Sequence, residues 1–384
     1  MGAGAHRGAA SSSTVSAHTA DRSKKCCDSV FRRIVFSAVL AATVFLGVCF
    51  LYLPDLFDLS GPFGPLAETG EVTVLVWAQP FGRRNKLPDC RALYQVEGCT
   101  LTDDQRAYPK ADAVIMHHRE VGSGVVKLPS KKRPAKQKWI WMNFESPTHS
   151  PGLSSLNGLF NLTMSYRKDS DIFLPYGCLV PNNLSALWNH YPYPLRALAP
   201  TSQLLRPLLL AWVVSNWSGS HARVVFYNTL RQYITVDLFG RAGKPLPNDI
   251  GNESVLRLLE QYQFYLSLEN SKHTDYITEK LWNAILAGSI PVVLGPSRQN
   301  YERFLPPEAF IHVDDFPTVR ELAEYLQMLR REPVRLRKHL DWRGNYSVHR
   351  ISFWDEQYCM ACKTVMKKRG RTQVVRDLNT WFSS

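Results

Sequence analysis

Short apolar runs alternate along this chain with longer polar segments whose apolar positions recur at helical spacing. The runs form two series, residues 72–77, 113–116 and 139–142, then 208–214, 235–239, 262–268, 290–294 and 310–313. Buried strands that alternate with helices are typical of parallel sheets. The pattern therefore predicts an α/β protein with two Rossmann-like, doubly wound domains that face a cleft. A proline-rich stretch between the series places their boundary near residue 205, giving domains 71–205 and 206–384.

The N-terminal region predicts a membrane anchor. No charged residue occurs between Ile34 and Leu53, and at about 1.5 Å per residue this helix would cross a hydrocarbon layer of roughly 30 Å. Basic residues precede the segment, so the positive-inside rule places residues 1–33 in the cytosol. A cleaved signal peptide would have a shorter apolar core, followed by small residues. We therefore expect a signal anchor at 34–53, a stem at 54–70 and a lumenal globular part.

The stretch from Tyr265 to Lys280 predicts a strand, a turn and the start of a helix. The apolar run ends at Glu269–Asn270, a polar turn follows, and Thr274 or Asp275 supplies the N-cap of the helix. The helix ends at Gly288, and the run 290–294 completes a strand–helix–strand unit. Ligands of parallel sheets bind at the carboxyl ends of strands, which is where this turn lies.

Three side chains of that predicted helix point to a diphosphate site. Tyr276, Glu279 and Lys280 are spaced i, i+3 and i+4, so they share one face of the first helical turns. Free backbone N–H groups and the helix dipole favour an anion there, with Lys280 as counter-charge and Glu279 available for sugar hydroxyls. The alternative is a solvated surface pair, which is common on helices.

The first series offers a general base. Glu145 comes just after the run 139–142, while Gln79 and His118 follow the two earlier runs, so the three should converge on an acceptor site. Glu145 is the predicted base and His118 the competing one. The alternatives are a loop carboxylate for Glu145 and a structural imidazole for His118.

The second series offers a cation for an anionic ligand. Ser215 and Asn216 directly follow the run 208–214, and Arg223 lies on a predicted helix over residues 221–232. A guanidinium suits a diphosphate because it donates two parallel hydrogen bonds, although an arginine at such a position is commonly a surface residue.

Several motifs resemble those of the vertebrate α-1,3-fucosyltransferases, over roughly residues 71–384. They are Phe144-Glu-Ser-Pro-Thr-His149, Asp169-Ser-Asp-Ile-Phe-Leu-Pro-Tyr-Gly177, Trp212-Val-Val-Ser-Asn-Trp217 and the run from Asp275 to Pro296. Residues 310–317 and 353–356 look most similar to the myeloid-type, Lewis x-synthesising branch of that family.

The resemblance implies a B-type glycosyltransferase fold and an inverting enzyme. It would move L-fucose from GDP-β-L-fucose to the 3-hydroxyl of GlcNAc in N-acetyllactosamine glycans of glycoproteins and glycolipids, in the Golgi membrane. Glu145 would be the base, Arg223 and Lys280 would hold the diphosphate, and Glu279 would hold the ribose. The remaining donor-pocket positions implied are Ser215, Asn216, Tyr265, Asn270 and Tyr276, with Tyr176 near the bound sugars.

Two other functions stay open at this point. A metal-dependent Golgi transferase using another sugar nucleotide would need Asp169 and Asp171, which have the D-x-D form. We expect no essential metal, because two cations and a helix N-terminus can neutralise the leaving group. A non-catalytic glycan-binding Golgi protein would lack the base or the cations, whereas Glu145, Arg223 and Lys280 are all present. The net charge of +13 invites a nucleic-acid partner, but a lumenal domain meets none. Assembly as a homodimer is left open.

Cysteines and sequons agree with a secretory compartment. We expect disulfides among Cys90, Cys99, Cys359 and Cys362, either as two local pairs or as cross-links between the ends of the globular part, with Cys178 left over. Candidate N-glycosylation sites are Asn161, Asn183, Asn252 and Asn345, while the sequon at Asn216 should stay unmodified because it lies in the donor site.

Overall fold

The computed structural model describes residues 70–182, 206–246, 253–371 and 373–384. The predicted cytosolic tail, the anchor at 34–53 and the stem up to residue 69 lie outside these ranges, as do the sequons at Asn183 and Asn252. Within the described ranges, no helix combines the length and the apolar character needed to cross a bilayer.

The first sheet is fully parallel, with the strand order β2-β1-β3-β4-β5-β6. Its strands are β1 (Val72–Val76), β2 (Cys99–Thr102), β3 (Ala113–His117), β4 (Lys138–Asn143), β5 (Leu162–Ser165) and β6 (Ile172–Phe173). The central strands β3 and β4 are buried along their whole length, which is why they read as continuous apolar runs rather than as alternating patterns. The helices α2 (Cys90–Tyr94) and α3 (His118–Gly122) lie in the connections between these strands.

The second sheet is also parallel, with the order β12-β11-β10-β8-β9. Its strands are β8 (Leu208–Val214), β9 (Asp237–Gly240), β10 (Tyr262–Leu268), β11 (Ile290–Leu294) and β12 (Ile311–His312). Its helices are α5 (Ala222–Leu230), α6 (Glu253–Leu259), α7 (Glu279–Ala287), α8 (Arg298–Tyr301), α9 (Val319–Arg331) and α10 (Pro333–Lys338). Apolar clusters cover both faces, one with α5 and α9 and the other with α6 and α7, so the sheet is doubly wound.

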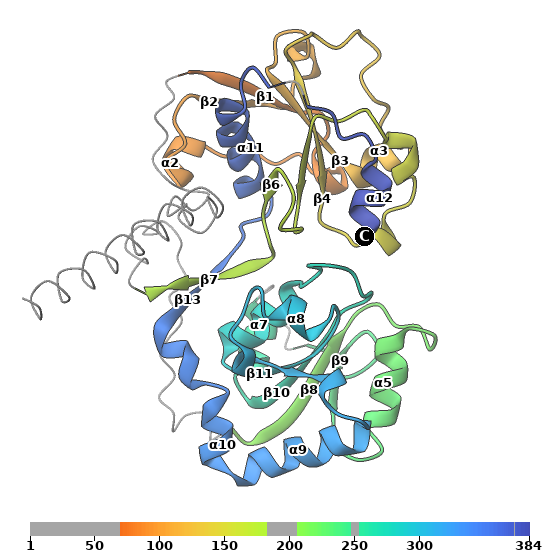
Figure 1. The fold of residues 1–384 in the computed structure, drawn as a ribbon, viewed down its shortest axis with the longest axis vertical. Coiled ribbons are helices and arrows are strands. Elements are labelled where there is room, and N and C mark those ends of the chain that lie inside the picture. Colours follow the sequence, from red (N-terminus) through yellow and green to blue (C-terminus); the bar gives the residue numbers. More distant parts are fainter. Residues whose placement is uncertain (1–69, 183–205, 247–252, 372) are drawn as a thin grey trace, which may run out of the picture. The chain divides into compact units, whose positions relative to one another are not determined.

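The C-terminal segment returns to the first sheet. Strand β13 (Tyr346–Arg350) pairs antiparallel with β7 (Gly177–Pro181). Helix α11 (Asp355–Lys367) then packs on β1, β2 and α2, and α12 (Leu378–Ser383) joins the core cluster around Trp141. Figure 1 shows α11 beside β1 and β2. A division at residue 205 thus separates the two sheets, but the chain after Asp355 belongs with the first. We call the first sheet with α11 and α12 the first lobe, and the second sheet with its helices the second lobe.

Two disulfides fasten α11 to the first lobe. Cys359 bonds to Cys90 and Cys362 bonds to Cys99, so of the two pairings left open by the sequence, the cross-linking one is confirmed. Cys359 and Cys362 are spaced i, i+3 and therefore share one face of α11. Cys178 is a free thiol, and burial raises its pKa to about 12.

Removing one of these bridges should lower stability strongly. Each bridge closes a loop of more than 260 residues, with sequence separations of 269 and 263. Loss of a native disulfide of this kind typically costs about 2–5 kcal/mol. We expect the double variant Cys90→Ser, Cys359→Ser to unfold at a lower temperature than the parent protein in calorimetry. Cys178→Ser is the matched control, and an unchanged transition in the double variant would contradict the structural role of the bridge.

Candidate functional site

A cavity of about 1040 Å³ is lined by both lobes. It brings together every residue proposed for the donor pocket, with the proposed base and one proposed acceptor residue. They are Glu145, Tyr176, Ser215, Asn216, Arg223, Tyr265, Asn270, Tyr276, Glu279 and Lys280. The two remaining acceptor candidates, Gln79 and His118, are not among its lining residues.

The topology of the second sheet explains the position of the cavity. Strand β9 lies to one side of β8, whereas β10, β11 and β12 lie on the other, so the strand order reverses between β8 and β10. Crevices form at the carboxyl ends of strands at such a switch point. Ser215 and Asn216 directly follow β8, and Asn270 is the second residue after the end of β10.

Helix α7 begins later than the sequence pattern predicted. Its N-cap is Thr278, and neither Thr274 nor Asp275 caps it. Asp275 adopts a left-handed backbone conformation with φ +60°. Its carboxylate instead accepts hydrogen bonds from Asn300 Nδ2 at 2.6 Å and from the backbone N–H of Lys168 at 2.9 Å. Tyr276 therefore precedes the helix, yet it lines the same cavity as Glu279 and Lys280.

Lys280 is held by a carboxylate that sequence reasoning did not assign to the site. Its Nζ lies 3.1 Å from Glu269 Oε2 and 3.2 Å from Glu279 Oε1. Burial would lower the pKa of Lys280, but the charges of Glu269 and Glu279 outweigh burial, and the pKa lies above its ordinary value. The lysine is therefore a fixed cation at the cavity wall.

Glu269 organises the start of α7. Its side chain is 1% exposed, and Oε1 accepts from the backbone N–H of Thr278 at 2.8 Å and from the Thr278 hydroxyl at 3.0 Å. A buried carboxylate needs both hydrogen bonds and a counter-charge. The Glu269–Thr278–Lys280 cluster meets both needs at the place where β10 ends and α7 begins.

Arg223 is the second cation of the cavity. It is 5% exposed, and its Nη2 donates to the backbone oxygen of Asn216 at 2.6 Å. Its Nε is buried without a hydrogen-bond partner among the described residues. Burial lowers the pKa of Arg223, while Glu269 and Glu279 act in the opposite direction. A buried guanidinium with unused donors at a cavity wall suits a phosphate or carboxylate ligand.

Glu145 enters the cavity from the first lobe. It lies on the loop after β4, and its own backbone N–H donates to Asn143 Oδ1 at 3.1 Å. Its side chain is exposed, and within the described residues its carboxylate takes part in no hydrogen bond or ion pair. The Tyr176 hydroxyl donates to the oxygen of Phe144, next to Glu145. Glu145 is thus held through its backbone, and its carboxylate stays available to a ligand.

His118 is held inside the first lobe, which favours the structural alternative over its predicted role as acceptor ligand or base. The ring is 2% exposed, Nε2 bonds to the oxygen of Pro151 at 3.0 Å, and Nδ1 accepts from Trp141 Nε1 at 3.2 Å. Gln79 also lies outside the cavity, because its amide bonds to the oxygen of Asn85 and to Asp103 Oδ2, both at 2.9 Å.

The structural role of His118 predicts a pH dependence of stability. Burial lowers its pKa from 6.5 to about 4. Between these values the unfolded chain binds a proton that the folded chain does not, so the free energy of unfolding falls as the pH falls through this window. We expect His118→Gln to lose less of its melting temperature between pH 7 and pH 5 than the parent protein does. An equal loss in both proteins would contradict this role.

Some residues of the cavity were missed at the sequence level. Arg350, Ile351, Ser352 and Phe353 line it from the end of β13, and Asn283 does so from α7. The pairing of β13 with β7 joins residues far apart in sequence, and no local pattern reports it. Asn283, however, lies on the helix turn after Glu279, so the i, i+4 spacing used for the other helix residues could have found it.

The D-x-D pair is used inside the first lobe. Asp169 pairs with Arg167 at 2.9 Å, and Asp171 pairs with Lys368 and accepts from the backbone N–H of Thr163 at 2.9 Å. Neither residue lines the cavity. Within the described residues, no group of three histidine, cysteine or carboxylate side chains is arranged to hold a metal ion.

The sequons differ in their surroundings. The Asn161 amide is part of the fold, since its oxygen accepts from the backbone N–H of Trp139 at 2.8 Å and its nitrogen donates to the oxygen of Gln373 at 2.8 Å. Glycosylation replaces one of the two hydrogens on that nitrogen and leaves the other able to donate, so glycosylation at Asn161 stays a prediction. Asn345 is exposed.

Comparisons with known proteins identify the family of the chain. A fucosyltransferase N-terminal family model matches residues 69–177, and the C-terminal model of glycosyltransferase family 10 (fucosyltransferase) matches residues 205–381. Crystal structures of an α1,3-fucosyltransferase resemble the fold. The one with GDP-fucose has a TM-score of 0.50 at 18% identity and covers 81% of this chain and 95% of its own. Another has a TM-score of 0.51 at 16% identity, covering 82% and 93%. The two family models together match most of the chain, and they show that it is a glycosyltransferase.

Relatives at higher identity narrow that class. Human α-(1,3)-fucosyltransferase 4 is 44% identical over 87% of this chain and 68% of its own length. The cattle form is 42% identical over 91% and 94%. Mouse 4-galactosyl-N-acetylglucosaminide 3-α-L-fucosyltransferase 9 is 43% identical over 81% and 82%. The chain belongs to glycosyltransferase family 10, the fucosyltransferases.

Proposed function

We propose that this protein is an inverting α-1,3-fucosyltransferase that moves L-fucose from GDP-β-L-fucose to the 3-hydroxyl of GlcNAc in N-acetyllactosamine glycans. The single observation that carries this proposal is the cavity that Glu145 of the first lobe lines together with Arg223 and Lys280 of the second. The acceptors are glycans of glycoproteins and glycolipids, giving Lewis x-type products. We place the protein in the Golgi membrane as a single-pass type II protein, on the basis of the apolar segment 34–53.

The reaction needs a base on one side and anion stabilisation on the other. Glu145 takes the proton of the acceptor hydroxyl while the oxygen of that hydroxyl bonds to C1 of fucose. The bond from C1 to the diphosphate oxygen breaks on the opposite face, and its electron pair leaves with GDP. One displacement inverts the β-linkage of the donor to the α-linkage of the product.

Fixed cations stabilise the departing diphosphate. Arg223 offers one N–H donor, on Nε, that has no partner among the described residues, and Lys280 offers a cation that its carboxylate neighbours hold in place. Glu279, which is half exposed at 53%, accepts from the ribose hydroxyls. Tyr265, Asn270, Tyr276, Ser215 and Asn216 surround the nucleotide and fucose, and Tyr176 lies beside the sugars. These groups allow the reaction to proceed without an essential metal.

A transfer assay with the detergent-solubilised full chain tests the proposal. Labelled GDP-fucose is offered with N-acetyllactosamine in its neutral and sialylated forms, each with and without EDTA. We expect fucose on the 3-hydroxyl of GlcNAc in both buffers, detected by mass spectrometry and NMR of the product. Transfer that stops in EDTA would favour a metal-dependent enzyme, and binding without any transfer would favour a glycan-binding protein.

A further inference from the structure

The loop from Asn270 to Tyr276, here called the bridging loop, links the second lobe to the first. Ser271 Oγ donates to Ser146 Oγ at 2.7 Å. His273 Nε2 lies 2.7 Å from Thr148 Oγ1, and Asp275 receives the backbone N–H of Lys168. Polar contacts between two lobes thus gather on one short segment, which also contributes Asn270 and Tyr276 to the cavity.

On the first lobe, the bridge meets the residue next to the base. Ser146 directly follows Glu145 and is 0% exposed. Its backbone oxygen accepts from Ser150 Oγ at 2.8 Å, and that hydroxyl in turn accepts from Asn143 Nδ2 at 2.8 Å. Asn143 also accepts the backbone N–H of Glu145. The backbone of the base therefore belongs to a hydrogen-bonded network that ends at Ser271.

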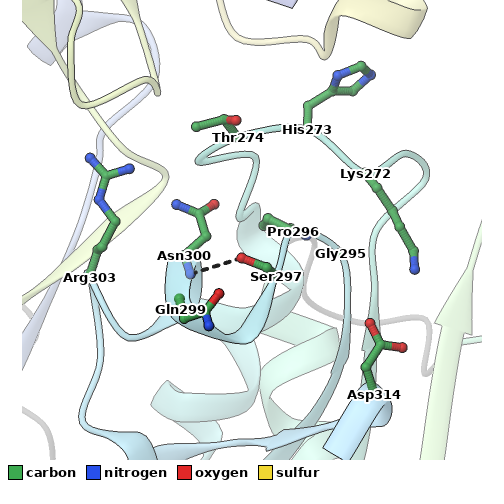
Figure 2. Close-up of a pocket in the computed structure, with 10 residues that line it drawn as sticks. All are labelled: Lys272, His273, Thr274, Gly295, Pro296, Ser297, Gln299, Asn300, Arg303 and Asp314. Carbon is green, nitrogen blue, oxygen red and sulfur yellow. Dashed lines mark hydrogen bonds between the residues drawn. The ribbon is translucent and has the colours of Figure 1, made fainter. Parts of the chain in front are cut away.

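On the second lobe, the far end of the bridging loop is held rigidly. The Asp275 carboxylate bonds to Asn300 at 2.6 Å and to Arg303 at 3.1 Å, and Asn300 Oδ1 accepts the Asp275 backbone N–H at 2.7 Å. Asn300 and Arg303 border a second cavity of about 620 Å³. Figure 2 shows Asn300 and Arg303 below the segment that carries His273 and Thr274. Because the loop is anchored at this end, movement of Ser271 is restricted.

We propose that the Ser146–Ser271 hydrogen bond is a positioning bridge, which sets the Glu145 loop at the correct distance from the donor pocket. This inference rests on the proposed function, since it assigns Glu145 the role of base. A base must reach its proton within about 2.6–3.2 Å, and a displacement of about 1 Å can cost about 100-fold in rate. Neither Ser146 nor Ser271 is among the residues that line the cavity, so we assign them a positioning role.

Removing either hydroxyl should slow chemistry without weakening donor binding. We expect Ser271→Ala and Ser146→Ala to lower kcat by about 10- to 100-fold, with GDP affinity in calorimetry unchanged within about twofold. Ser271 also bonds to Asn270, and Ser146 also bonds to His149. The contact that both variants lose is the Ser146–Ser271 hydrogen bond. The double variant should therefore be no slower than the slower single variant. Ser271→Thr keeps a hydroxyl and should restore most of the rate.

Ser155→Ala is the matched control, because Ser155 is exposed and bonds only within its own turn, to Gly152. Hydrogen exchange supplies a readout independent of activity. Ser271→Ala should speed exchange in a peptide covering residues 143–150 and leave the core strand β3 unchanged. If the parent protein transferred no fucose, the proposed function would fail, and exchange would still decide whether the bridge orders this loop. Unchanged exchange over 143–150, or additive losses of kcat in the double variant, would overturn the bridge.

Discussion

Replacing Glu145 with Gln should lower kcat by about 10² to 10⁴, the usual contribution of a well-placed general base, while GDP binding stays unchanged. The substitution keeps the shape of the side chain and removes its ability to take a proton. The contacts that hold the loop use the backbone of Glu145 and the side chains of Asn143 and Ser146, so they persist in the variant. Steady-state kinetics with GDP-fucose and calorimetry with GDP measure the two effects separately.

Glu97→Gln is the matched control for this experiment. Glu97 is an exposed carboxylate of the same lobe, 3.6 Å from Arg91, and it does not line the cavity. Its loss should leave both kcat and GDP affinity unchanged. Near-normal turnover by purified Glu145→Gln would show that another group removes the proton.

The part of the cavity that the second lobe lines could be predicted from sequence because its determinants are local. Strands β8, β10 and β11 match the predicted runs residue for residue, since strands buried on both faces leave continuous apolar patterns. The residues that follow β8 and β10 then meet at the switch point. Family resemblance supplied the individual roles of those residues, which topology alone does not give.

What the sequence could not predict depends on pairing between distant segments. Strands β7 and β13 have five residues each and pair with each other, and the whole second lobe lies between them in the sequence. The packing of α11 on the first sheet likewise depends on two disulfides whose partners a sequence cannot choose. Arg350 and Phe353 reach the cavity through these elements and were therefore missed.

The predicted start of α7 was wrong for a related reason. Asp275 has the correct residue type and spacing for an N-cap, but Asn300, Arg303 and Lys168 use its carboxylate for tertiary contacts. His118 shows the opposite case. It follows a strand of the first sheet, a position typical of ligand-binding residues, yet both of its ring nitrogens form hydrogen bonds inside the lobe, with Trp141 and Pro151. Position in a topology thus selects candidates, and the hydrogen-bond partners decide among them.

Lys280 combines a binding role with a folding role, and removing it should show both. Lys280→Ala leaves the buried carboxylate of Glu269 without its 3.1 Å partner, and breaking a buried ion pair typically costs about 3–5 kcal/mol. The variant also loses one cation of the diphosphate site. Since a hydrogen bond to a charged group contributes about 1.5–3 kcal/mol, we expect GDP affinity to fall by about 10- to 100-fold.

A second substitution separates these two roles. In the double variant Lys280→Ala, Glu269→Gln the buried charge is gone, and the new amide side chain keeps an oxygen for the backbone N–H of Thr278, which donates to Glu269 in the parent protein. Thermal unfolding should therefore recover toward the parent value while GDP affinity stays low. Lys272→Ala is the matched control, because this exposed lysine borders the second cavity and not the first. Unchanged GDP affinity in the double variant would move the diphosphate away from Lys280, whereas recovery of affinity along with stability would mean that Lys280 acts only through the fold.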